Sequence, residues 1–209
     1  DQVSLRQLAV VMESAARAEE LCVIRLPLGW NGRYRDFTGP LDYLGADGGG
    51  GLGAGPGNAV GAALALRDMG STRIPVALVG DGDFLMGATA VWTAVRYGIP
   101  VLIIVCNNHS FFNDELHQER VARERARPVE NRWVGQKMTE PEIDLAKMAE
   151  SMGALGIGPV RRAQDLPAAL RTGIEAVRAG RACVIDASVV PGYDSNMSGQ
   201  SGSSAVHKR

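Results

Sequence analysis

Two polar residues, Asp81 and Asn108, come at the ends of two short apolar runs, and their side-chain oxygens could bind a metal ion. A carboxylate and an amide oxygen are hard ligands of the kind that Mg2+ or Ca2+ takes. Gly80 and Gly82 flank Asp81, and glycine lets the backbone turn sharply and approach a ligand closely. The backbone amides of Gly82 and Asp83 lie where a helix is expected to begin, which suits a phosphate oxygen. Together these residues predict a site for a metal-bound diphosphate.

The segments around these residues follow the order strand, loop, helix, strand. Strands are expected over 76–79 and 101–106, because continuous apolar, β-branched runs suit strands buried on both faces of a parallel sheet. A helix is expected over 85–97. A right-handed crossover then places Asp81 and Asn108 at the carboxyl ends of parallel strands, the edge where open α/β sheets bind ligands. The alternative is an ordinary βαβ unit with a turn aspartate and a capping asparagine.

The motif has a specific spacing: GDG at 80–82, 24 further residues, and then NN at 107–108. This pattern resembles the cofactor signature of enzymes that depend on thiamine diphosphate (ThDP). Within that superfamily the chain is similar to the group of acetolactate synthase, benzoylformate decarboxylase and pyruvate decarboxylase. The resemblance covers about 48–193, which is most of the chain.

The resemblance implies two cofactors, ThDP and Mg2+. It makes Asp81 and Asn108 side-chain ligands of the metal, with Ser110 giving its backbone carbonyl. The further positions of the GDG segment that are expected to contact the cofactor are Gly80, Gly82, Asp83 and Phe84.

A glycine-rich stretch at 48–53 formally matches the dinucleotide fingerprint G-x-G-x-x-G, but no strand immediately precedes it. A nucleotide-binding Rossmann oxidoreductase is therefore the weaker interpretation. The resemblance instead implies that Gly50, Gly51, Leu52 and Gly53 form the turn that holds the aminopyrimidine ring of ThDP. The Gly50 carbonyl and the Leu52 amide would bond the ring, and the Leu52 side chain would pack beneath the cofactor and bend it. The alternative is a glycine-rich turn with Leu52 in the core.

Composition limits the other classes of protein. The chain has 209 residues, 45% of them hydrophobic, which is enough for one domain with a full core. Its net charge of −1 gives no electrostatic basis for binding nucleic acid or an anionic membrane. No apolar run approaches the roughly 20 residues of a membrane span, and the first residues do not form a secretory signal. Cys22, Cys106 and Cys183 lie in apolar runs and indicate buried thiols of a cytoplasmic protein.

The rest of the chain alternates in the same way. Further strands are expected over 22–26, 155–160 and 182–189, and further helices over 3–21, 58–69, 114–127, 140–153 and 165–179. This alternation predicts a doubly wound, mostly parallel α/β sheet with helices on both faces, here a diphosphate-binding domain over 1–194. The Ser/Gly-rich stretch 195–209 is expected to be a mobile tail.

Three regions leave alternatives open. His109 and Phe111 either face substrate or, for His109, belong to a solvated loop. The charged helix at 114–127 is either a solvated face or, by resemblance, a lid or subunit contact. The loop 27–47, rich in Gly, Pro and aromatics, is expected to reach the site edge and, with the helix at 58–69, to present a contact surface.

The resemblance implies an enzyme that cleaves or forms C–C bonds next to a carbonyl, as a 2-oxo acid decarboxylase or an acetolactate synthase-like carboligase. It places the activating glutamate on a pyrimidine-binding domain, so His109 is the one catalytic candidate here. The chain is expected to be a piece of a longer polypeptide or one subunit of a split enzyme, in a homo- or hetero-oligomer (dimer or tetramer) that takes a small 2-oxo acid or related carbonyl substrate. A non-catalytic ThDP-fold regulatory or binding module is the alternative.

Overall fold

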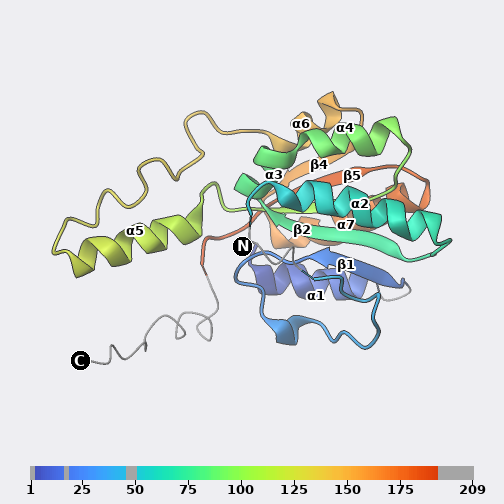
Figure 1. Cartoon of the computed structure of the whole chain (residues 1–209), viewed down its shortest axis with the longest axis horizontal. Coiled ribbons are helices and arrows are strands. Elements are labelled where there is room, and N and C mark those ends of the chain that lie inside the picture. The colour runs from blue at the N-terminus through green and yellow to red at the C-terminus, as the bar shows by residue number, and fades with distance from the viewer. Residues whose placement is uncertain (1–2, 17–18, 46–50, 193–209) are drawn as a thin grey trace.

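The structure, a computed structural model, describes residues 3–16, 19–45 and 51–192. Within these residues five strands form one parallel sheet in the order β1-β2-β3-β5-β4. Their bounds are β1 (Leu21–Arg25), β2 (Ile74–Gly80), β3 (Leu102–Asn107), β4 (Leu155–Val160) and β5 (Cys183–Ser188). Figure 1 shows the sheet lying between layers of helices. The predicted doubly wound α/β fold is confirmed.

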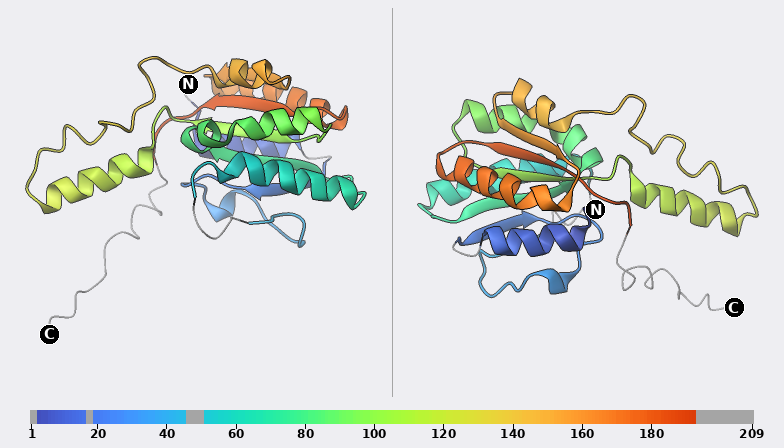
Figure 2. Two further views of the ribbon diagram at one scale, coloured as in Figure 1. Left: turned by 45° about the horizontal axis from the view of Figure 1, so that its top comes forward. Right: turned by 180° about the vertical axis from the view of Figure 1, so that it is seen from behind.

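Two hydrophobic cores lie on the two faces of the sheet. Helices α1 (Leu5–Ala15) and α7 (Leu166–Arg178) cover one face, and α2 (Ala54–Asp68), α4 (Thr89–Arg96) and α6 (Leu145–Ser151) cover the other (Figures 1 and 2). Successive strand residues point to opposite faces of a sheet. In β2, accordingly, Val76 and Leu78 belong to the core under α1 and α7, whereas Ala77 and Val79 belong to the core under α2, α4 and α6. Burial on both faces explains why the strands are continuous apolar runs rather than alternating ones.

The register brings the polar ends of neighbouring strands to one edge. Gly80 of β2 pairs with Cys106 of β3, and Asn107 of β3 pairs with Ser188 of β5. The chain therefore leaves β2 and β3 at the same carboxyl edge of the sheet, as the sequence predicts.

The helix predicted over 85–97 begins earlier and is divided. It forms α3 (Asp81–Gly87) and then α4, so the GDG segment is the start of a helix rather than a turn before one. At this division the backbone of Gly87 packs closely on the start of α2, because a Cβ at Gly87 would overlap the carbonyl oxygen of Gly53. The backbone at 87–88 therefore lies against the start of α2. This helix begins at Ala54 rather than at the predicted 58.

One other helix start was predicted wrongly. The helix expected over 140–153 is the shorter α6, and its N-cap is Asp144, whose side chain accepts a hydrogen bond from the Lys147 amide. α7 begins at Leu166 with Asp165 at its N-cap position, close to the predicted start, but the Asp165 side chain makes no capping bond and pairs with Arg162. Charged and polar residues near a helix start do not by themselves identify which of them is the cap.

The described part of the loop at 27–47, residues 27–45, packs its aromatic residues internally, so they are not exposed, while its role as a contact surface stays a prediction. Trp30 is buried, just before a short 3-10 turn (Gly32–Tyr34), and its ring meets that of Tyr34 edge to face at 5.5 Å. Phe37 and Tyr43 stack at 5.0 Å against the core shared by α1 and α7. The end of the loop runs beside β1 through backbone hydrogen bonds to Val23.

One helix stands away from the sheet. Figures 1 and 2 show α5 (Phe112–Glu124) and the segment that follows it, up to α6, projecting from the body of the molecule. Glu115 is the one buried residue described in α5, and Trp133 and Val134 in the next segment are about half exposed. The role of this arm as a lid or subunit contact stays a prediction.

Two smaller expectations concern the environment of the chain. The three cysteines are buried free thiols, as predicted. In the part of the chain that the structure describes, no helix combines the length and the apolar character that crossing a membrane requires. Residues 195–209, the expected mobile tail, lie outside the described residues.

The close packing of α6 on β4 gives a test of the fold. A Cβ at Gly156 would overlap the carbonyl oxygen of Ala146, so Gly156→Ala should lower the free energy of unfolding by roughly 1–3 kcal/mol through overpacking. Gly61 of α2 is the matched control, because a Cβ there meets nothing within 4 Å. Gly61→Ala should raise the free energy of unfolding by roughly 0.5–1 kcal/mol. Urea unfolding of both variants checks this, and equal effects would contradict the packing described.

Candidate functional site

Asp81 is a buried carboxylate at the first position of α3, where β2 ends. Its side chain is 5% exposed. The Gly82 amide donates to its Oδ1 at 2.8 Å, and the Ser110 amide donates to its Oδ2 at 3.1 Å. The carboxylate thus joins the start of α3 to the loop that follows β3.

The charge of Asp81 is poorly compensated by the protein itself. Burial raises the pKa of this carboxyl from 3.8 to about 6, while hydrogen bonds from Gly82, Ser110 and His109 amides lower it by less. Among the described residues no lysine or arginine forms an ion pair with it. A buried carboxylate in this state gains from a bound cation.

Asn108 brings a second oxygen to the same place. Its Oδ1 accepts a hydrogen bond from the Ser110 amide at 3.0 Å, so the Asp81 and Asn108 oxygens converge on one backbone N–H. A carboxylate oxygen beside an amide oxygen offers the kind of donor that Mg2+ prefers. The residues present therefore fit a divalent metal ion.

The two asparagines of the NN pair have different roles. Asn107 turns inward: its Nδ2 donates to Asp186 Oδ1 at 3.0 Å, and its Oδ1 accepts from the His109 amide at 3.0 Å. Asp186 is 1% exposed, and burial raises the pKa of its carboxyl. The sequence analysis missed this pair, although an aspartate inside the apolar run of β5 was a signal for a buried polar contact.

A second missed residue, Glu115, supports the loop from the other side. The Ser110 hydroxyl donates to the Glu115 carboxylate, which is buried in the first turn of α5. The strand-like segment at 136–138 also pairs with this loop, because Met138 N donates to the His109 carbonyl and Phe111 N to the Gln136 carbonyl. Nothing in the charge pattern of α5 distinguished Glu115 from its solvated neighbours.

The glycine turn lies against the same site. Gly53 adopts φ +89°, a left-handed conformation that favours glycine, and begins α2. Its amide donates to Asp83 Oδ1 at 2.7 Å, which joins the turn to the GDG segment. Leu52 is 51% exposed, so the interpretation that places it in the core does not hold. Gly51 is exposed, and Gly50 lies outside the described residues.

A pocket of about 400 Å3 connects these elements. Its polar wall includes Asp81 and Asn108, and its apolar wall includes Leu28, Leu52, Phe111 and Phe112. Gly80, Gly82, Asp83 and Ser110 also line it. The structure thus brings Leu52 into one pocket with Asp81, Asn108 and Ser110, the three residues that the sequence predicts as metal ligands.

Some predicted positions contribute less than expected. The Phe84 side chain is fully buried in the core under α2 and α4, so it does not offer a contact to a ligand. The Gly82 amide is bonded to Asp81, and the Phe111 ring lies so close to Gly82 that a Cβ there would overlap it. His109 adopts φ +59°, and its Nε2 lies 3.4 Å from Ser188 Oγ, outside the set of residues that lines the pocket. Its catalytic role stays a prediction.

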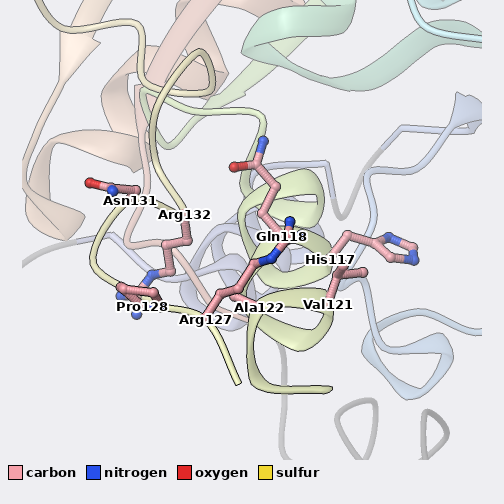
Figure 3. Close-up of a pocket in the computed structure, with 8 residues that line it drawn as sticks. All are labelled: His117, Gln118, Val121, Ala122, Arg127, Pro128, Asn131 and Arg132. Carbon is pink, nitrogen blue, oxygen red and sulfur yellow. The ribbon is translucent and has the colours of Figure 1, made fainter. Parts of the chain in front are cut away.

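A second hollow of about 400 Å3 lies on the projecting arm, between α5 and the segment 127–132 (Figure 3). Its charged side chains include Arg132, which is ion-paired with Glu119. None of the residues predicted to do chemistry lines it, so the polar sheet edge is the candidate site.

Comparison with known proteins identifies the family. The chain matches the family described as "Thiamine pyrophosphate enzyme, C-terminal TPP binding domain" over residues 27–187, where thiamine pyrophosphate is another name for ThDP. The chain belongs to this family. The resemblance inferred from the GDG and NN motifs is confirmed.

Individual relatives of this ThDP-binding domain are larger proteins. A 2-hydroxyacyl-CoA lyase of Oryza sativa subsp. japonica is 32% identical over 154 residues, which cover 73% of this chain and 24% of the relative. The acetolactate synthase large subunit of Parasynechococcus marenigrum is 30% identical over 138 residues, which cover 65% of this chain and 21% of the relative. The chain therefore spans about a fifth to a quarter of the length of these relatives.

Solved structures agree. The ThDP-dependent 4-hydroxybenzoylformate decarboxylase of Rhodococcus jostii superimposes with a TM-score of 0.71 at 26% identity, covering 92% of this chain and 33% of that one. Benzoylformate decarboxylase of Polynucleobacter necessarius gives a TM-score of 0.75 at 20% identity, with 92% and 34% covered, which supports the fold.

The raised pKa of Asp81 gives a test in the metal-free chain. Its folded value of about 6 lies above the ordinary 3.8, so the protonated form stabilises the fold and that stabilisation is lost as pH rises through about 6. Relative to Asp81→Ala, the wild type should lose roughly 2 kcal/mol of unfolding free energy between about pH 4.5 and pH 8. Urea unfolding in EDTA measures this, with the exposed Asp68→Ala as control. Parallel pH profiles for wild type and Asp81→Ala would contradict the burial argument.

Proposed function

We propose that this chain binds the diphosphate of ThDP through Mg2+ and forms the C-terminal part of an enzyme that cleaves or forms C–C bonds next to a carbonyl. One observation carries the proposal: the Asp81 and Asn108 oxygens converge on the Ser110 amide in a pocket that Leu52 also lines. Metal ligands and the cofactor-bending residue of the family thus share one cavity.

Asp81, Asn108 and the Ser110 carbonyl are the proposed protein ligands of Mg2+. Asp81 supplies the negative charge, and the cation removes the cost of burying that charge without a partner. Mg2+ commonly binds one or two carboxylates together with substrate phosphates and water, so three protein ligands leave positions for a diphosphate. The Asn107–Asp186 and Ser110–Glu115 bonds hold the loop that carries two of these ligands.

The glycine turn is the proposed seat of the aminopyrimidine ring. Leu52 stands half exposed on the pocket wall, where an apolar side chain can pack beneath a cofactor. When bound, ThDP supplies the electron sink for breaking or making a bond next to a carbonyl. Leu28, Phe111 and Phe112 form an apolar wall that would limit water at this place.

The named relatives favour an enzyme over a non-catalytic module. They comprise an acetolactate synthase, a hydroxyacyl-CoA lyase and a decarboxylase of an aromatic 2-oxo acid. These names share ThDP-dependent chemistry next to a carbonyl but differ in substrate. We therefore propose a 2-oxo acid or related carbonyl as the substrate class of the complete protein.

The complete site is proposed to need a second, pyrimidine-binding domain. This chain covers about a third of each of the two solved structures named above, so most of such a protein lies outside it. The acid that activates the aminopyrimidine ring is expected on the other domain, from the same polypeptide or from a partner, in a dimer or tetramer. α2 and the α5 arm are the candidate contact surfaces.

Removal of the metal or of its carboxylate ligand should abolish cofactor binding. Asp81→Ala should weaken Mg2+-dependent ThDP binding by more than about 100-fold, because loss of even an outer-sphere partner of a metal ligand costs about 10–100-fold. EDTA should have the same effect on the wild type, and Asp68→Ala should bind normally. Titration calorimetry measures this, and wild-type affinity in Asp81→Ala would overturn the proposed metal site.

The chain by itself should show no decarboxylase or carboligase turnover, even with ThDP and Mg2+ supplied. It provides the diphosphate and metal ligands but neither the activating acid nor full exclusion of water. Adding the pyrimidine-binding part should restore turnover of a 2-oxo acid and give at least a dimer of the assembled unit. Robust decarboxylation of pyruvate or benzoylformate by the chain, running as a monomer in size-exclusion chromatography, would contradict this.

A further inference from the structure

Asp83 connects three segments that are far apart in the sequence. Its Oδ1 accepts hydrogen bonds from the amides of Gly53 at 2.7 Å and Gly55 at 3.2 Å. Its Oδ2 lies 3.0 Å from Arg25 Nε, an ion pair that does not have the geometry of a hydrogen bond. The Asp83 carboxylate, 4% exposed, is therefore bonded to the glycine turn and paired with the end of β1, while its backbone belongs to the GDG segment.

The glycine turn fits against α3 without spare room. A Cβ at Gly55 would overlap the Asp83 carboxylate, and a Cβ at Gly87 would overlap the Gly53 carbonyl oxygen. The backbone of the turn thus packs directly on both ends of α3. The Gly53 and Gly55 amides, at the start of α2, both donate to one Asp83 oxygen, and these two hydrogen bonds fix the position of Leu52 relative to the GDG segment.

This arrangement places an additional negative charge beside the proposed diphosphate site. Asp83 lines the same pocket as Asp81, and two buried carboxylates next to a diphosphate would repel it. Arg25 lines this pocket too, its side chain 14% exposed, and its guanidinium compensates the Asp83 charge. Among the residues that the structure describes, no arginine or lysine pairs with Asp81 in this way, so its charge is left for the metal.

We propose that Asp83 and Arg25 are a positioning pair: Asp83 sets the Gly53–Gly55 turn against the diphosphate side of the pocket, and Arg25 cancels the charge that this requires. The inference rests on the proposed function, because it concerns how this pocket accepts ThDP. It assigns a role to two side chains, apart from the metal ligands and the backbone contacts already described.

Four variants separate position from charge. Arg25→Met leaves the Asp83 charge uncompensated and should lower the affinity for ThDP with Mg2+ by roughly 10-fold or more. Arg25→Met combined with Asp83→Asn should recover most of that loss, since Asn can still accept the Gly53 and Gly55 bonds without a charge. Asp83→Ala loses those bonds and should bind weakly, whereas Asp83→Asn alone should bind close to the wild type.

A matched control comes from another partly buried ion pair of the same type. Arg73 Nη1 lies 2.6 Å from Asp42 Oδ1, and neither residue lines the pocket. Arg73→Met should lower the melting temperature as Arg25→Met does but leave the ThDP affinity unchanged. Melting temperatures of all variants, measured without cofactor, show whether each one is folded.

Titration calorimetry of ThDP in saturating Mg2+ decides the outcome. Weak binding in Arg25→Met, with recovery in the double variant and normal binding in Arg73→Met, supports the pair. Equal affinity of the wild type and a folded Arg25→Met, or no recovery in a folded double variant, overturns it. Failure of the proposed function is distinct, because the wild type itself would then bind no ThDP.

Discussion

The structure of the polar edge depends on a buried carboxylate with which no lysine or arginine of the described residues forms an ion pair. Asp81 leaves the sheet at the end of β2 and is held by two backbone amides, and burial still raises its pKa to about 6. A fold optimised for stability alone would not keep such a group. The surrounding elements can be understood as the means of keeping this charge in place and next to a second oxygen ligand.

Hydrogen bonds between segments that the parallel sheet brings to one edge keep the Asp81 carboxylate in place. Asn107 anchors the loop after β3 to Asp186 of β5, and Glu115 of α5 bonds the Ser110 hydroxyl in the same loop. His109, between them, has a positive φ that non-glycine residues rarely adopt. Such local strain is typical of functional sites, where the surrounding structure over-determines the backbone. Asp83 holds the glycine turn in place by hydrogen bonds, as Asn107 holds the loop after β3.

The sequence was sufficient to predict the fold and the juxtaposition of Asp81 and Asn108, because both depend on local patterns. Apolar runs identified all five described strands, and β4 has the bounds predicted for it. The parallel arrangement then placed Asp81 and Asn108 at one edge. The partners of buried polar side chains were not predictable in the same way. Asn107 and Asp186 are separated by 79 positions and Asp83 and Gly53 by 30, and periodicity does not say which distant segments meet. The aromatic residues of 27–47 were misjudged for a related reason, since a loop without periodicity gives no sign of which face it packs against.

The most direct test of the account is the position of the metal. Crystals of the chain grown with ThDP and Mn2+, a close substitute for Mg2+ that scatters anomalously, would show it in an anomalous difference map. The account predicts one peak bonded to the Asp81 carboxylate, the Asn108 amide oxygen and the Ser110 carbonyl, at the roughly 2.1 Å typical of such oxygen ligands, with the diphosphate completing its coordination. A ThDP molecule bound elsewhere, or bound here with its metal away from Asp81, would contradict the account.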